Sequence, residues 1–75
     1  MTVTIRHRLH DGWSTLTERT FTADLPEGYH PARDHLFGRT CQGDNGPEYV
    51  AGIVKQIQLT DEGLTLVVEQ IGAVA

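Results

Sequence analysis

Apolar and polar residues alternate along the first segment of the chain, as in a β-strand with one buried face. Val3, Ile5, His7 and Leu9 fall on one face, and threonine and arginine residues fall on the other. Nineteen residues of the chain are threonine, valine or isoleucine, whose branched side chains suit a pleated sheet better than a helix. The pattern therefore predicts a mainly β protein.

A turn over residues 10–12 is expected to join this strand to a second one over residues 13–25. A two-residue Asp-Gly loop would pair Leu9 with Ser14 and scatter the apolar residues between the two faces. A three-residue loop instead pairs Leu9 with Trp13 and keeps the large apolar residues on one face. We therefore favour the three-residue loop.

A second hairpin is predicted over residues 49–71, with its turn at residues 61–63. One register places Ile57 on the face of Leu64, whereas a loop of different length pairs Ile57 with Val67. The sequence leaves both registers open. In either register, apolar residues lie on both faces, so we expect this hairpin to be covered on both sides.

The alternation in Gly52–Leu59 and Asp61–Glu69 is similar to that in the hairpins of small β-barrels such as SH3-like domains. It is a resemblance in pattern and includes no family motif. It implies a sheet that curls into a small barrel.

The middle of the chain, residues 26–48, is rich in glycine, proline, aspartate and asparagine. Structureless loops of this length are uncommon in compact domains, so we expect an internal element. Pro31 suits the first position of a helix and Gly38 suits the position after its end, which predicts a short helix over Pro31–Phe37. Residues 43–47 then form tight turns.

The predicted architecture is a single domain over residues 1–75. It consists of a hairpin over 2–25, a loop with the short helix over 26–48, and a hairpin over 49–71. The hairpins would form an antiparallel sheet of four to five strands.

The formal net charge of −4 is unevenly distributed along the chain. Residues 1–40 contain five arginines and five acids, whereas residues 41–75 contain one lysine and five acids. This balance disfavours non-specific binding of nucleic acid by the whole molecule. A single cysteine, Cys41, excludes an internal disulfide and favours the cytoplasm. No apolar run approaches the ~20 residues of a membrane span, so we expect no membrane association.

The second hairpin is more apolar than one face of a sheet requires, which suggests an interface. We therefore expect a small, soluble, non-catalytic module that acts as an adaptor or inhibitor on a larger protein, or that pairs with itself as a homodimer. Its size also suits an accessory protein of a phage or mobile element. The expected contacts are Trp13, Phe37 and Tyr49 as anchors, with Arg6 and Arg8 at the rim. Packing in the core competes with the anchor role for each aromatic residue.

Binding of nucleic acid is the main alternative function. Arg6, Arg8 and His10 alternate along the outer face of the first strand and form a cationic stripe that could contact phosphates. Glu18 on the neighbouring strand is expected to neutralise part of this stripe. The sequence places no row of aromatic residues on the same face for bases to stack on.

A metal site is the second alternative. His30, His35 and Cys41 are potential zinc ligands, with Asp34, His7 or His10 as a fourth ligand. Their spacing matches no compact zinc motif, and we expect no cofactor.

The sequence contains no recognised catalytic motif. Ser14 lies outside a G-x-S-x-G turn, Lys55 lies outside a phosphate-binding loop, and nothing around Cys41 indicates an activated thiol. We therefore expect no enzymatic activity.

Overall fold

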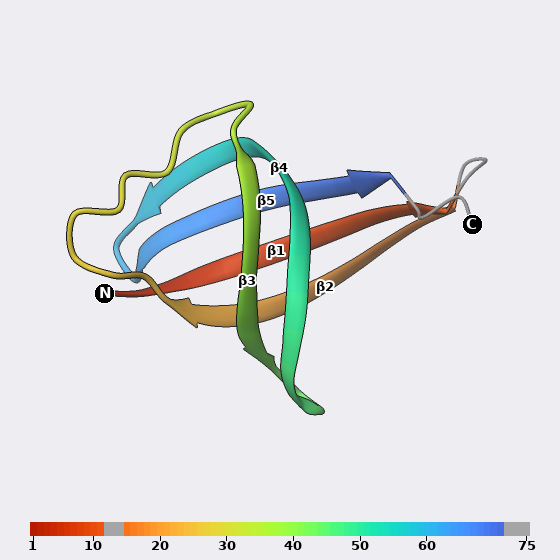
Figure 1. Cartoon of the computed structure of the whole chain (residues 1–75), viewed down its shortest axis with the longest axis horizontal. Helices are drawn as coiled ribbons and strands as arrows, with labels where there is room; N and C mark the ends of the chain where they lie inside the picture. The colour runs from red at the N-terminus through yellow and green to blue at the C-terminus, as the bar shows by residue number, and fades with distance from the viewer. Residues whose placement is uncertain (12–14, 72–75) are drawn as a thin grey trace.

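The computed structural model describes residues 1–11 and 15–71, which form five β-strands in one closed ring (Figure 1). The strands are β1 (Thr2–Asp11), β2 (Thr15–Asp24), β3 (Leu36–Gly43), β4 (Gly46–Thr60) and β5 (Gly63–Ile71). Strands that follow one another in sequence pair antiparallel, and β5 returns to pair with β1 in parallel, which closes the barrel. The prediction of a mainly β fold is confirmed.

The predicted helix over residues 31–37 is wrong, because Arg33 and Asp34 form a turn and β3 begins at Leu36. The backbone N–H of Asp34 donates to the carbonyl of Val54 at 2.7 Å, and the N–H of Val54 donates to the carbonyl of His35 at 3.0 Å. Asp34 has a φ of 67°, which is incompatible with a right-handed helix. The described residues contain no helix of the length and apolarity that crossing a membrane would require.

The strand β3 lies within the segment expected to be a loop. Its burial alternates, with Phe37 and Cys41 buried and their neighbours more exposed, as in a strand with one face on a core. The turn Asp44-Asn45 joins it to β4 with Gly43 opposite Gly46. The chain therefore forms an additional hairpin where a loop with a short helix was expected.

The register of β1 with β2 differs from the favoured prediction. Leu9 pairs with Thr17 rather than with Trp13, and residues 12–14, which connect the strands, lie outside the described part of the chain. The observed register places Ile5 directly opposite Phe21, so these two buried residues face each other across the strands. Burial of both side chains therefore determines the register, and it outweighs the preference of the turn residues for a three-residue loop.

The register of β4 with β5 matches the first of the two predicted alternatives, since Ile57 pairs with Leu66 near the turn. A β-bulge between Val54 and Gln56 then shifts the pairing by one residue. Beyond the bulge Val54 pairs with Val68, and both are fully buried. The bulge therefore turns Val54 toward the core.

The core is apolar throughout, and among the described residues it contains no buried polar side chain. Its members are Val3, Ile5, Phe21, Ala23, Leu25, Phe37, Cys41, Val50, Val54, Leu66 and Val68. They come from all five strands and from the residue that follows β2, so the core is one cluster enclosed by the ring.

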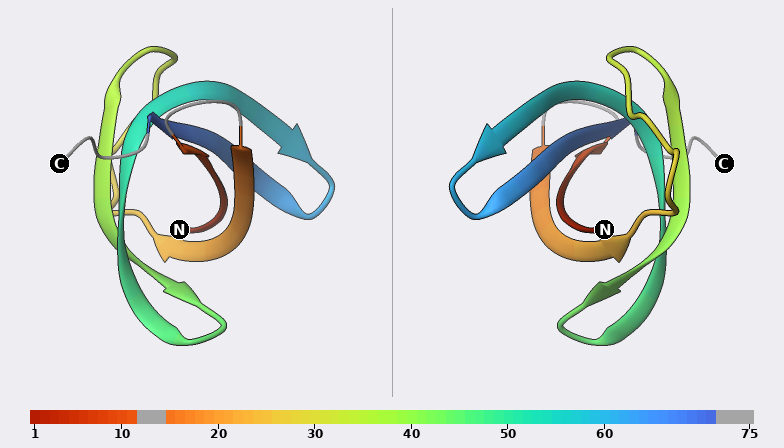
Figure 2. Two further views of the ribbon diagram at one scale, coloured as in Figure 1. Left: turned by 90° about the vertical axis from the view of Figure 1, so that its right-hand side faces the viewer. Right: turned by 90° about the vertical axis from the view of Figure 1, so that its left-hand side faces the viewer.

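The strand β4 bends so that its first part lies beside β3 and its last part beside β5 (Figure 2). As a result, β3 and the first part of β4 run across β1, β2 and β5 (Figure 1). The ring is weakest between β2 and β3, which share only the pair Thr22 and Gln42. The β3–β4 hairpin is thus a ribbon whose outer face is directed away from the core.

Candidate interaction surface

The outer face of the β3–β4 ribbon carries a continuous row of mainly apolar residues, which we call the outer stripe. Because side chains alternate along a strand, cross-strand partners with the same orientation share this face. The outer stripe comprises the pairs Leu36 and Ile53, Gly38 and Ala51, and Thr40 and Tyr49.

The large side chains of the outer stripe are open to solvent. Leu36 is 82% exposed, Tyr49 is 68% exposed and Ile53 is 37% exposed. They border an open groove of about 940 Å³, in which Gly38 and Ala51 are small lining residues. Contiguous exposed apolar surface of this kind marks a binding surface more often than a solvated face.

Tyr49 lies across the backbone of Gly38. A Cβ atom at Gly38 would come within 2.5 Å of the Tyr49 hydroxyl oxygen, so glycine provides the space that this side chain occupies. Aromatic side chains that cover a glycine on a neighbouring strand stabilise sheets in this way. The position of Tyr49 is therefore set by the ribbon itself.

One end of the groove is polar and carries both signs of charge. His10 Nε2 lies 3.0 Å from Glu69 Oε1, and Lys55 also lines this end. His7 Nε2 lies 2.9 Å from Oε1 of Gln70, the residue of β5 that follows Glu69. The surface thus combines an apolar stretch with a polar end.

The predicted anchor residues have different positions in the structure. Phe37 belongs to the core with 3% exposure, so its assignment as an exposed anchor is wrong. Trp13 lies outside the described residues. Tyr49 is exposed in the outer stripe together with Ile53, which belongs to the hairpin expected to form an interface. Sequence reasoning missed Leu36, because it joins them only when β3 pairs with β4.

Arg6 and Arg8 belong to a chain of alternating charges that reaches the polar end of the groove at Glu69 and His10. Arg6 donates to Glu18 Oε1 at 2.6 and 3.1 Å, and Arg8 Nε lies 3.3 Å from the second oxygen of Glu18 without a hydrogen bond. Arg8 also lies 3.8 Å from Glu69, which pairs with His10. The hydrogen bonds from Arg6 hold the pKa of Glu18 below its ordinary value. The predicted stripe is therefore largely neutralised by carboxylates.

A second arginine and carboxylate pair lies near Tyr49, outside the lining of the groove. Arg19 on β2 donates to both oxygens of Glu48 on β4, at 3.0 and 2.6 Å, and lies 4.9 Å from the centre of the Phe21 ring. These hydrogen bonds raise the pKa of Arg19 and lower that of Glu48. The pair links β2 to the ribbon where few backbone hydrogen bonds do so.

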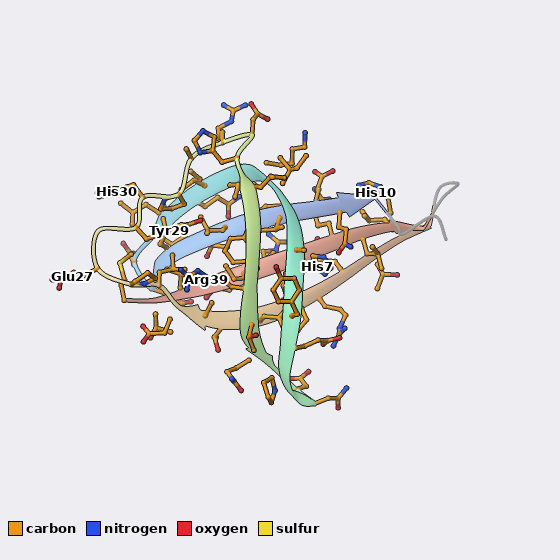
Figure 3. All side chains as sticks on the ribbon, viewed as in Figure 1. His7, His10, Glu27, Tyr29, His30 and Arg39 are labelled. Atoms are coloured by element: carbon orange, nitrogen blue, oxygen red, sulfur yellow. The ribbon has the colours of Figure 1, made fainter. Side chains whose placement is uncertain are left out.

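The candidate metal ligands are dispersed. Cys41 is fully buried and its thiol donates to the carbonyl of Arg39 at 3.6 Å, whereas His30 and His35 are exposed in the loop before β3. Figure 3 shows His30 and His10 near opposite ends of the molecule. Within the described ranges, no three histidine, cysteine, aspartate or glutamate residues are grouped for a metal ion.

Burial also determines the chemistry of Cys41. Desolvation raises the pKa of its thiol, with Arg39 exerting a smaller opposing effect. A thiol of this kind is a poor nucleophile at neutral pH. Cys41 therefore acts here as a small core residue.

Searches against protein-family models, curated protein sequences and solved structures found no match to this chain. Any inference about its function therefore depends on the surfaces described above.

Proposed function

We propose that this chain is a small, non-catalytic interaction module that pairs with a second copy of itself through the outer stripe. The observation that supports this function is the exposure of Leu36, Tyr49 and Ile53 around a groove with small residues in it. Small domains commonly gain buried surface by self-association when they lack disulfides or structural metals.

The shape of the outer stripe suits a twofold interface. Such an interface uses the same patch on both copies, so the patch must be complementary to itself. Tyr49 covers Gly38 of its own chain, and Leu36 and Ile53 are exposed at the other end of the stripe, so Tyr49 of one copy can pack on Leu36 and Ile53 of the other. Lys55 and Glu69 at the polar end supply opposite charges that can pair across the same axis.

The exposed apolar side chains also give the strength of this association. Full burial of an aliphatic or aromatic side chain contributes roughly 1.5–3 kcal/mol. A twofold interface covers the exposed parts of Leu36, Tyr49 and Ile53 on both copies, which together contribute roughly 5–11 kcal/mol. Association costs about 4 kcal/mol or more in lost translational and rotational freedom. The balance corresponds to a dimer that dissociates in roughly the high micromolar to millimolar range.

The buried thiol of Cys41 supports two further parts of the proposal. Its raised pKa argues against a cysteine nucleophile, in keeping with a non-catalytic module. A free cysteine is typical of a reducing compartment, and we place the protein in the cytoplasm on that basis.

The experiment is a measurement of molecular mass by light scattering and sedimentation from about 10 µM to 1 mM, the range in which the dimer should form. Leu36→Asp places a charge in the outer stripe. Leu59→Asp is the matched control, because Leu59 is 83% exposed but does not line the groove. We expect a concentration-dependent dimer for the parent chain and Leu59→Asp, and a monomer for Leu36→Asp.

Two results would overturn self-association. One is a monomer at every concentration, in which case the groove would remain open to a different protein. The other is equal disruption by both substitutions, since that would separate dimerisation from the outer stripe. Circular dichroism of each variant establishes that the fold is intact.

A further inference from the structure

A second hollow, of about 490 Å³, lies beside the β-bulge of β4 and gathers cations from three separate parts of the chain. Arg8 comes from β1, Arg33 from the loop before β3, and Lys55 from the bulge. The remaining lining residues are Gln56, Ile57, Val67 and Glu69. We call this feature the basic hollow.

The fold holds two of these cations together through the backbone. The hydrogen bonds of Val54 with Asp34 and His35 attach the loop to β4 immediately before the bulge. Arg33 precedes the attached residues, and Lys55 is the extra residue of the bulge. Bulges often re-aim a side chain toward a functional site.

Two cations of the basic hollow, Arg33 and Lys55, lack the carboxylate partners that the arginines elsewhere have, whereas Arg8 lies near Glu18 and Glu69. Arg6 and Arg19 each lie 2.6 Å from a carboxylate oxygen. In the described part of the chain, no acid lies within ion-pair distance of Arg33 or Lys55. Glu69 is the single acid lining the hollow, and both it and Glu18 lie beside Arg8, so Arg33 and Lys55 supply the uncompensated charge, in a chain of net charge −4.

The lining of the basic hollow includes apolar surface. Val67 is only 4% exposed, and Ile57 beside it is partly buried. This apolar part is small and most of the lining is polar, so the attraction of the hollow for an anion depends on its cations. Arginine side chains also match the oxygens of a phosphate in pairs.

We propose that the basic hollow binds a phosphate group carried by a larger molecule. Its volume exceeds that of a single water or phosphate, so part of an attached group fits beside Ile57 and Val67. The phosphate belongs either to a small phosphate ester or to the backbone of a nucleic acid strand. Lys55 and Glu69 line both the groove and the hollow, but Arg33 lines only the hollow, so a substitution of Arg33 tests this site independently of self-association.

The test is a titration of the ¹⁵N-labelled chain with inorganic phosphate, followed by the amide shifts of Gln56 and Val67. Sodium chloride at matched ionic strength separates site binding from screening. Arg33→Gln removes one cation of the hollow. Arg39→Gln is the control with the same change in charge, because Arg39 lies 5.3 Å from the Tyr29 ring centre and does not line the hollow (Figure 3).

We expect saturable shifts in the parent chain and in Arg39→Gln, and roughly three- to tenfold weaker binding in Arg33→Gln. Shifts that chloride reproduces, absence of saturation, or equal weakening by the two substitutions would overturn the proposal.

Two further titrations identify the source of the phosphate. Adenosine monophosphate and a single-stranded oligothymidylate are compared at the same phosphate concentration. Tighter binding of the oligonucleotide, with an affinity that falls steeply with salt, assigns the site to nucleic acid. Equal or tighter binding of the monophosphate assigns it to a small phosphate ester. Failure of both to bind would contradict the proposed site.

Discussion

Replacing Gly52 with alanine tests how closely β4 and β5 approach beside the groove. A Cβ atom at this position would lie 2.5 Å from the backbone oxygen of Glu69 and 2.8 Å from Cγ1 of Val68. Both contacts are far shorter than van der Waals distances, and the first is to backbone held in the sheet. Relief therefore requires that one strand move relative to the other.

Gly38 provides a matched comparison because its Cβ atom would also meet an oxygen at 2.5 Å. That oxygen belongs to the hydroxyl of Tyr49, which ends an exposed side chain and can rotate away. Alanine is also favoured over glycine within a strand by roughly 0.5–1 kcal/mol. The same substitution at the same distance thus meets a rigid obstacle at Gly52 and a movable one at Gly38.

Overpacking of a rigid site costs about 1–3 kcal/mol, and we expect Gly52→Ala near the upper end of this range. Gly38→Ala should change the free energy of unfolding by less than about 1 kcal/mol. A chain of this length has a total stability of roughly 4–11 kcal/mol, so the first loss is a large fraction of it.

Urea unfolding followed by circular dichroism measures both changes. With a slope near 1 kcal/mol per molar, Gly52→Ala should lower the midpoint by roughly 2–3 M and Gly38→Ala by less than about 1 M. Equal shifts for the two variants would refute the reasoning, because they would show that the identity of the obstructing atom is irrelevant.

Three further predictions concern charge, the thiol and the aromatic residues. Because the pKa of Glu18 is lowered in the folded chain, its ion pair with Arg6 stabilises the fold at pH values above the ordinary glutamate pKa. This stabilisation is lost as the pH falls through the lower pKa of the folded state. An NMR titration of Glu18 should give a midpoint below 4.5, and this midpoint should rise with salt. Cys41 should react with a thiol reagent in the folded chain at least roughly a hundredfold more slowly than in urea, and equal rates would contradict its burial. Phe37→Ala should cost about 3–5 kcal/mol of stability and Tyr49→Ala far less, whereas similar losses would contradict the assignment of one to the core and the other to the surface.

The parts of the fold that local pattern controls could be predicted from the sequence. The alternation of apolar and polar residues identified β1. The second hairpin was also predicted, and the structure has one of the two registers that the sequence left open. The helix prediction failed because Pro31 and Gly38 are signals read from a few neighbouring residues. Hydrogen bonds to Val54, some twenty residues further along the chain, decide the outcome instead. Pairing between distant segments leaves no such mark in either segment.

The candidate binding surfaces likewise depend on pairing between distant segments, which the sequence does not show. Tyr49 could be chosen as an exposed contact because aromatic residues are common at interfaces, but Leu36 joined it only through the pairing of β3 with β4. Neutralisation of the arginine stripe likewise depends in part on Glu69 of β5. Arg33 and Lys55 offered no signal, since a loop attachment and a bulge bring them together.

Closure of the ring by β1 and β5 has a consequence for how the chain is made. Their paired residues are 61 positions apart, so β1 must wait for β5 to be synthesised before its second edge is covered. The β1–β2 and β3–β4 hairpins use nearer pairings and can form during translation, but neither encloses a core alone. Until β5 is complete, β1 presents an unpaired edge with Ile5 and Val3 exposed beside it, and neighbouring nascent chains could pair with that edge. Pairing of β5 with β1 therefore removes an edge at which neighbouring chains could misassemble.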